Sequence, residues 1–251
     1  MKKPDALNNV RIVLSHTSHP GNIGAAARAM KTMGLERLYL VNPKSFPDPV
    51  ADSRAAGASD VLEKAQVCAS LDEALAGTVL AVAVTARRRD LSHEMLPARQ
   101  AASRLLGSAV QGEVALLFGT EMSGLSNAEL DKCQLLATIP ANPEFSSLNL
   151  GAAVQILCYE LRMAFLDGVE MPAAKTTEVA GFDEVERFYR HLEQTIVDTG
   201  FLDPANPGRL MQRLRRLFAR SRMEKEEVSI LRGILTSVDK FTEKCKKSIV
   251  D

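Results

Sequence analysis

The chain has 251 residues, 46% of them hydrophobic and 25% charged, so a full-sized core is possible and wholesale disorder is not indicated. Its 31 basic residues balance 31 acidic ones, so any nucleic-acid binding must use a local basic patch. The four cysteines form no CxxC pair and the histidines no HExxH motif, which argues against a metal and favours reduced thiols. Without a secretory signal or a bilayer-length apolar run, the sequence predicts a soluble, cytoplasmic protein.

The first two thirds of the chain alternate short apolar runs with helical patterns. Strands are expected at Val10–Ser15, Arg37–Val41, Val79–Val84, Glu113–Phe118 and Leu135–Ile139, and helices near Gly24–Met33, Leu71–Leu75, Ala98–Leu106, Asn127–Cys133 and Ser147–Leu166. The runs VLAVAV and EVALLF are continuously hydrophobic, as in strands buried on both faces. The pattern predicts an α/β fold with a mainly parallel sheet covered on both faces.

The composition changes after Asp167. Residues 168–181 contain Pro, Gly and Thr without apolar periodicity, which is typical of a linker. Three helical patterns follow, and the break DPANPG separates the first from the second. We therefore predict a domain at 1–167, a linker at 168–181 and a small helical extension at 182–251.

Polar loops follow the predicted strands, on the side of the sheet where α/β proteins bind ligands. The stretch HTSHPGNIGAAAR places a glycine-rich turn before an Ala-rich helix, a layout typical of phosphate-facing loops although it is not GxGxxG. Arg28 in this stretch is either a ligand-facing or an ordinary solvated arginine. The turn ARRRD at residues 86–90 either binds phosphate or is a solvated turn.

Two further loops carry candidate polar groups. In LFGTEMSGL, Glu121 lies between two glycines, either as a site residue or in a plain connection. In IPANPEFSSLNLGAAVQI, Ser146 or Ser147 could cap the apolar helix that follows, a contribution of about 1 kcal/mol, or face a ligand. Asn149 nearby brings more polar groups than one cap requires.

The C-terminal extension contains an arginine-rich segment, RLMQRLRRLFARSR, without a single acid. An arginine face on an appended helix is a credible footprint for an RNA backbone. A solvated helix whose charge is answered by the acids of the adjacent MEKEEV explains the pattern equally well.

Taken together, the loops are far more specific than any one of them. The segments SHPGNIGAAARAMKTMGL, LLFGTEMSGLS and IPANPEFSSLNLGAAVQI resemble, in order and spacing, the three signature motifs of the SPOUT class of RNA methyltransferases, in its 2'-O-ribose branch. The segments LYLVNP, AAGASDV, the TAR turn, ERFYRHLEQT, RLRRLF and ILRGIL extend the resemblance over about residues 10–238, to members that modify cytidine or uridine in tRNA. Pattern alone predicts an open doubly wound sheet; the resemblance implies a deep trefoil knot and a homodimer with sites at the subunit interface.

The resemblance also implies S-adenosyl-L-methionine as the cofactor, with no metal. The implied cofactor contacts are Thr85, Ala86, Gly119, Ile139, Ser146, Ser147 and Leu148. The implied catalytic and substrate-positioning residues are Arg28, Arg89 and Ser147. From the polar loops and the arginine-rich segment we predict as RNA contacts Asn22, Arg87, Arg88, Glu121, Asn149, Arg213 and Arg216. The chain departs from close relatives at Thr120, where a basic residue is expected, and at Phe145, where tyrosine is common.

The expected reaction is methyl transfer to a ribose 2'-hydroxyl of tRNA, with position 32 of the anticodon loop as the implied target. Arg28 is always protonated, so stabilising a developing alkoxide suits it better than base catalysis. Three alternatives remain: a nucleotide-dependent oxidoreductase, which lacks the full glycine fingerprint and has Asn42-Pro43 where an acid is expected; a non-catalytic RNA-binding protein; and a methyltransferase acting on rRNA.

Overall fold

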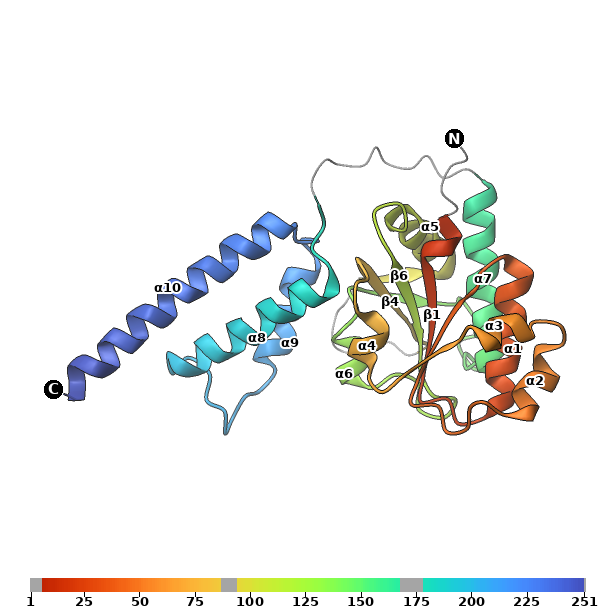
Figure 1. Ribbon diagram of the computed structural model, residues 1–251, viewed down its shortest axis with the longest axis horizontal. Helices are drawn as coiled ribbons and strands as arrows, with labels where there is room; N and C mark the ends of the chain where they lie inside the picture. The colour runs from red at the N-terminus through yellow and green to blue at the C-terminus, as the bar shows by residue number, and fades with distance from the viewer. Residues whose placement is uncertain (1–5, 87–93, 168–177, 251) are drawn as a thin grey trace. The chain divides into compact units, whose positions relative to one another are not determined.

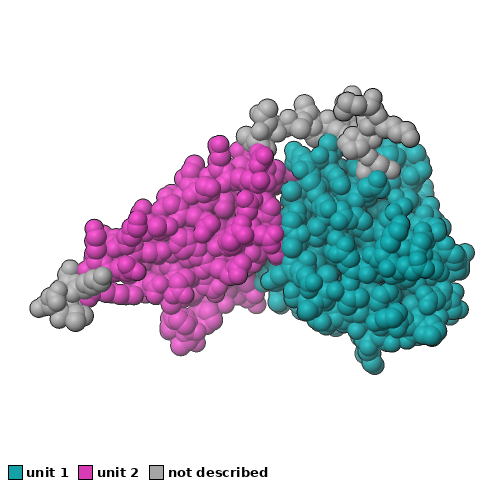
Figure 2. All heavy atoms as spheres, viewed as in Figure 1, with its two compact units in different colours: residues 1–174 teal, residues 175–251 magenta. Residues whose placement is uncertain are grey.

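The computed structural model describes residues 6–86, 94–167 and 178–250, with side chains up to residue 246. The chain forms two compact units, Met1–Ala174 and Lys175–Asp251, which Figure 2 distinguishes by colour. Each unit is described by itself below. The predicted linker lies mostly at residues 168–177, outside the described residues.

The first unit is built on a seven-stranded parallel sheet in the order β3-β2-β1-β6-β4-β7-β5. The strands are β1 Val10–Ser15, β2 Arg37–Val41, β3 Gln66–Cys68, β4 Leu80–Val84, β5 Met95–Pro97, β6 Val114–Phe118 and β7 Leu135–Thr138. The predicted α/β fold is confirmed, and β3 and β5 were not predicted. Strand β7 lies between β4 and β5, which come earlier in the chain, and this order fits the knotted topology that the resemblance implies.

Helices cover both faces of this sheet (Figure 1). After the 3-10 turn η1 Ala6–Asn9 come α1 Pro20–Met33, α2 Pro49–Ala55, α3 Ser59–Glu63, α4 Leu71–Leu75, α5 Ala98–Ser108, α6 Asn127–Leu130 and α7 Leu150–Leu166. On one face, Ile12 and Leu14 share a core cluster with α1, α5 and α7, while Val13 between them is fully buried outside that cluster. Such burial on both faces explains why the predicted strands are continuously hydrophobic.

Helix α1 has defined signals at both ends. Pro20 is its first residue, and the Nδ1 atom of His19 accepts a hydrogen bond of 3.0 Å from the Gly21 N–H. The helix ends at Met33 and is capped by Gly34, whose φ of +80° is easily adopted only by a residue without a Cβ. Pro20 and the His19 cap therefore fix the residue at which the loop after β1 becomes α1.

Two glycines let α1 approach its neighbours closely. A Cβ on Gly24 would lie 2.1 Å from the carbonyl oxygen of Ala51 in α2. A Cβ on Gly151 in α7 would lie 2.7 Å from the Cβ of Ala25. Both helices therefore pack on α1 at a distance that no other residue type allows.

The second unit consists of α8 Phe182–Asp198, α9 Leu210–Ala219 and α10 Lys225–Val250. Phe188 and Tyr189 form its core with residues of α10, and the Phe188 ring meets that of Phe218 edge-on at 5.0 Å. Residues 178–180, just before α8, hydrogen-bond to residues 223–225, with the Ala180 N–H donating to the Met223 carbonyl at 2.9 Å.

All four cysteines are free, as predicted: Cys68, Cys133 and Cys158 are buried and Cys245 is exposed. Burial raises the pKa of the Cys133 and Cys158 thiols, so both remain protonated and inert. Within the described ranges no three His, Cys, Asp or Glu side chains gather where they could hold a metal ion. No helix among the described residues has the length and apolar character needed to span a membrane.

We expect Gly24→Ala to lower the free energy of unfolding by about 1–3 kcal/mol, because the new methyl group meets backbone atoms that have no room to move. Gly107→Ala on α5 is the matched control: nothing lies within 4 Å of its added Cβ, so it should be neutral or stabilising by up to about 1 kcal/mol. Urea unfolding measures both. Equal behaviour of the two variants would contradict the close approach of α1 and α2.

Candidate active site

A pocket lies at the carboxyl ends of three neighbouring strands, β6, β4 and β7. It encloses about 800 Å³ of empty space that is open to solvent. Its walls come from the segment after β4, the segment after β6, and the loop from β7 into α7. This edge of a parallel sheet is where α/β proteins bind ligands. The lining residues are Val84, Thr85, Ala86, Phe118, Gly119, Thr120, Glu121, Met122, Ser123, Gly124, Ile139, Ser146, Ser147, Leu148, Leu150 and Ala153.

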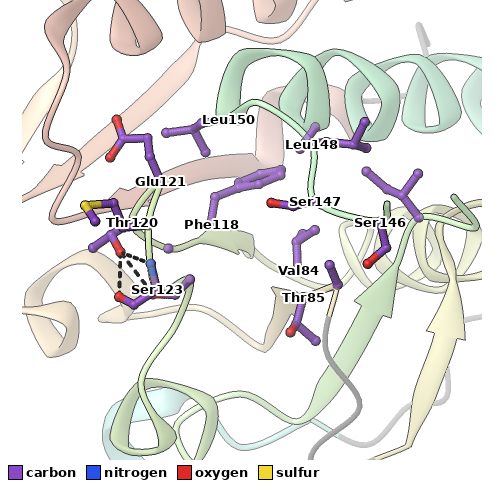
Figure 3. A pocket seen from close by; sticks show the side chains of 16 residues that line it. Val84, Thr85, Phe118, Thr120, Glu121, Ser123, Ser146, Ser147, Leu148 and Leu150 are labelled. Carbon is purple, nitrogen blue, oxygen red and sulfur yellow. Dashed lines mark hydrogen bonds between the residues drawn. The ribbon is translucent and has the colours of Figure 1, made fainter. Parts of the chain in front are cut away.

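The pocket combines apolar walls with hydroxyl groups from each side (Figure 3). Val84, Phe118 and Leu150 supply apolar surface, while Thr85 and Ser147 carry hydroxyls. Such a lining suits a small molecule that has both an apolar ring system and hydrogen-bonding groups. The structure brings all seven residues implied as cofactor contacts together in this one pocket: Thr85, Ala86, Gly119, Ile139, Ser146, Ser147 and Leu148.

The segment after β6 is a tight turn between Thr120 and Gly124. A Cβ on Gly119 would lie 2.3 Å from the Gly124 carbonyl carbon, so only glycine allows this approach of the two backbone strands. The Gly124 N–H donates to the Thr120 carbonyl at 3.0 Å, and the Thr120 and Ser123 hydroxyls are 2.8 Å apart. The threonine that replaces an expected basic residue therefore closes the turn with its hydroxyl.

Four hydrogen bonds converge on the carboxylate of Glu121. Its Oε2 accepts from the backbone N–H of Ser18 at 3.0 Å and from the Ser18 hydroxyl at 2.7 Å. Its Oε1 accepts from the His19 N–H at 3.1 Å and from the Asn22 amide at 2.9 Å. Ser18 and His19 immediately precede α1, so the negative charge lies at the positive end of that helix.

Asn149 connects the loop between β7 and α7 to the start of α1 and, through Asn22, to Glu121 in the turn after β6. Its Nδ2 donates to Asn22 Oδ1 at 3.0 Å, and its Oδ1 accepts from the Gly151 N–H at 2.9 Å. One loop-anchoring network thus joins the loop before α1, the turn after β6 and the loop before α7. Its members are Ser18, His19, Asn22, Glu121 and Asn149. The side chains of Asn22, Glu121 and Asn149, implied as RNA contacts, bind one another, and RNA contact by them stays a prediction.

The cap of α7 corrects one interpretation of the sequence. We expected Ser146 or Ser147 to cap a helix starting at Ser147; the helix instead starts at Leu150, with Asn149 as its cap. Asparagine is at least as good a capping residue as serine, and the longer connection lets its amide reach Asn22 as well. Both serines are therefore released from capping and line the pocket.

Burial of Glu121 opposes its ionisation, but the hydrogen bonds from Asn22 and Ser18 outweigh this cost and lower the pKa of the carboxyl from 4.5 to about 2. The network is consequently held by a full negative charge at neutral pH. The sequence indicated Glu121 but missed Ser18 and His19 as its partners. Their only signal was their place between a strand end and a helix start.

Arg28 does not line the pocket. It lines a second hollow, together with Gly151 and Gln155 of α7, whereas Leu150 and Ala153 of α7 face the first. The first turns of α7 thus separate Arg28 from the pocket of its own chain. Arg87, Arg88 and Arg89, which follow Ala86 at the pocket edge, lie outside the described residues.

The sheet order and the pocket formed by the segments after β4, β6 and β7 fit the SPOUT class of RNA methyltransferases, and comparison with known proteins identifies the family. The SpoU rRNA Methylase family matches residues 9–159, and the C-terminal domain of the tRNA methyltransferase TrmJ matches residues 183–247. The chain therefore belongs to the SpoU methylase family, and the resemblance stated from the sequence is confirmed.

Relatives match along nearly the whole chain. The tRNA (cytidine/uridine-2'-O-)-methyltransferase TrmJ of Pectobacterium atrosepticum is 53% identical over 93% of this chain and 98% of its own length. The enzyme of the same name from Photorhabdus laumondii is 51% identical over 95% of this chain and its full length. The crystal structure of TrmJ from Z. mobilis ZM4 superimposes with a TM-score of 0.80 at 33% identity, covering 91% of this chain and 98% of that one.

We expect Glu121→Gln to lower the free energy of unfolding at pH 7 by about 1–3 kcal/mol, because the amide replaces one of two accepting oxygens with a donor. The folded-state pKa lies below the ordinary value, so the advantage of the native protein is complete above pH 4.5 and is lost as the pH falls from 4.5 towards 2. Urea unfolding at pH 7 and pH 3.5 measures this. Glu63→Gln, exposed on α3, is the control. A Glu121→Gln deficit that is equal at both pH values would contradict this electrostatic role.

Proposed function

We propose that this protein transfers the methyl group of S-adenosyl-L-methionine to the ribose 2'-hydroxyl of cytidine or uridine in tRNA, with position 32 of the anticodon loop as its target. Membership of the SpoU methylase family and the names of its full-length relatives support the reaction and the substrate. The observation that carries the proposal is the convergence of the segments after β4, β6 and β7 on one pocket at the carboxyl ends of these strands. With tRNA as substrate and free thiols, we place the protein in the cytoplasm.

The residues present in the pocket fit the proposed cofactor. Ile139 and Leu148 offer an apolar slot for an adenine ring, and the hydroxyls of Thr85, Ser146 and Ser147 can bind polar groups of the nucleoside and the amino acid. When bound, S-adenosyl-L-methionine supplies a methyl group on a positively charged sulfur. The protein then has chiefly to position the 2'-hydroxyl and stabilise its developing negative charge.

Arg28 is our candidate for that stabilisation, since a guanidinium is charged at every relevant pH. Because α7 separates Arg28 from the pocket of its own chain, we propose a homodimer in which Arg28 faces the pocket of the partner subunit. Tyr159 and Leu166, seven residues apart on α7, are 47% and 59% exposed and give this helix an uncovered apolar side. Ser147 and Arg89 are the proposed substrate-positioning residues, with Arg87 and Arg88 as RNA contacts beside them.

The arginine-rich helix α9 is a proposed tRNA contact of the second unit. Arg215 is already engaged: it pairs with Glu186 of α8, and its guanidinium lies 4.4 Å from the centre of the Tyr189 ring. The acid that pairs with Arg215 thus comes from α8. Arg213 is exposed, Arg216 is partly exposed, and neither has an ion pair with another described residue, so these two can bind phosphate.

We expect Arg28→Ala to reduce methyl transfer to tRNA by about a hundredfold or more, because the developing alkoxide loses its positive partner. The affinity for S-adenosyl-L-methionine should stay unchanged, since Arg28 does not line the pocket. Single-turnover transfer of a labelled methyl group and calorimetry measure the two quantities. Arg104→Ala on α5, an exposed arginine outside both hollows, is the control. Near-native turnover of Arg28→Ala would rule out this role.

We expect the double variant Arg213→Ala, Arg216→Ala to bind tRNA more weakly and to reduce the slope of log affinity against log salt by about 0.7–0.9 per lost phosphate contact. Arg232→Ala with Lys240→Ala removes the same charge from the exposed surface of α10 and should change the slope less. Binding titrations at several salt concentrations decide this. Equal slopes for both double variants and the native protein would show that α9 makes no phosphate contact.

A further inference from the structure

A second hollow lies between α1, α2 and α7, on the other side of α7 from the cofactor pocket. It encloses about 870 Å³ of empty space open to solvent. Its polar lining consists of Arg28 and Thr32 from α1, Ser53 and Arg54 from α2, and Gln155 from α7. None of its lining residues is acidic. Two guanidinium groups therefore share one concave surface with neutral hydrogen-bonding groups.

The shape of this hollow follows from the close packing of the three helices. Gly24 brings α2 against α1, and Gly151 brings α7 against α1 from another side, at contacts of 2.1 and 2.7 Å for an added Cβ. Small residues at the floor, Ala25 and Ala29, leave the space above α1 open. The hollow is thus fixed by helices rather than by loops, which holds its polar groups in defined positions.

Both arginines are available to a ligand. The side chains of Arg28 and Arg54 are exposed, and neither side chain forms an ion pair or hydrogen bond with another described residue. Three arginines elsewhere in this unit are paired with acids: Arg11 and Arg37 with Glu113, and Arg99 with Glu160. Two like charges that line one hollow without an acid repel each other, and an anion bound there relieves that repulsion.

We propose that this hollow binds a backbone phosphate of the RNA substrate, with Arg54 supplying a second guanidinium beside Arg28. The proposal rests on the function proposed above. The two unesterified oxygens of a phosphodiester can accept hydrogen bonds from two planar guanidinium groups, and the hydroxyls and the amide can donate to the same two oxygens. A phosphate held here brings its own ribose within one nucleotide of Arg28. Arg54 is therefore a substrate-positioning residue and not a catalytic one.

The test compares Arg54→Ala, Arg54→Lys and the control Arg104→Ala. We expect Arg54→Ala to weaken tRNA binding by about five- to tenfold and to reduce the salt slope by about 0.7–0.9, whereas Arg54→Lys retains the slope and regains part of the affinity. The affinity for S-adenosyl-L-methionine and the kcat at saturating tRNA should stay native. In Arg28→Ala, by contrast, kcat falls.

A double-variant cycle asks whether the two arginines bind one phosphate. If they do, Arg28→Ala with Arg54→Ala weakens tRNA binding by less than the product of the two single effects, because the second change removes a partner already lost. Native tRNA affinity and salt slope in Arg54→Ala would overturn the inference, and so would a changed monomer–dimer equilibrium with a native slope, which would make the hollow a subunit contact.

The inference can fail separately from the function on which it rests. If the native protein methylates tRNA and Arg54→Ala binds tRNA with native affinity and slope, only the phosphate site is wrong. If the native protein transfers no methyl group to tRNA, the proposed function fails first. Thermal unfolding of Arg54→Ala confirms that its fold is intact, as expected for an exposed side chain.

Discussion

The geometry of the site depends on the carboxylate of Glu121. It accepts four hydrogen bonds from the loop before α1 and from the first turn of that helix. Asn22, one of the donors, accepts a hydrogen bond from Asn149 at the start of α7. Three loops that are far apart in the sequence are thereby fixed relative to one another before any ligand binds. Because the acceptor carries a full charge and its donors include backbone groups, the arrangement is stiff. A positioning enzyme, which has little covalent chemistry of its own, needs this stiffness most.

Helix α7 gives the site its second constraint. One side of its first turns closes the cofactor pocket through Leu150 and Ala153, and the other side borders the hollow that holds Arg28 and Arg54. In the proposed function, the methyl donor and the RNA backbone lie on opposite sides of this helix. The proposed reaction therefore uses surfaces of two subunits, which connects it with the proposed homodimer.

The sequence predicted the central strands well and the edges poorly. The bounds of β1 and β2 agree residue by residue, because four apolar residues within a run of five or six, bounded by turn signals, leave little choice. Strands β3 and β5 have only three residues each and lie at the two edges of the sheet, where Gln66 and Val67 are exposed, so no apolar run marks them. Asn149 was missed as the cap because two serines stood closer to the expected helix start.

Long-range partners were the other information that the sequence lacked. No pattern indicates that Glu121 meets Ser18, or that Glu186 rather than a neighbouring acid answers Arg215, since these pairs are joined only by the fold. Conversely, the seven pocket residues came from motif resemblance, and the structure brings them together without exception. The place of a residue at a strand end and its membership of a motif thus predict which residues line one pocket. Which side chains bind one another can be told only from the folded structure.

The two-sided use of α7 has a consequence for engineering this protein. Ala153 is a small residue on the pocket side, while Gly151 and Gln155 face the hollow. The pocket can be reshaped at Ala153 and Leu150 without changing any residue that lines the hollow. In the proposed function, selectivity for the methyl donor is therefore open to redesign apart from the proposed phosphate site, for transfer of groups larger than methyl.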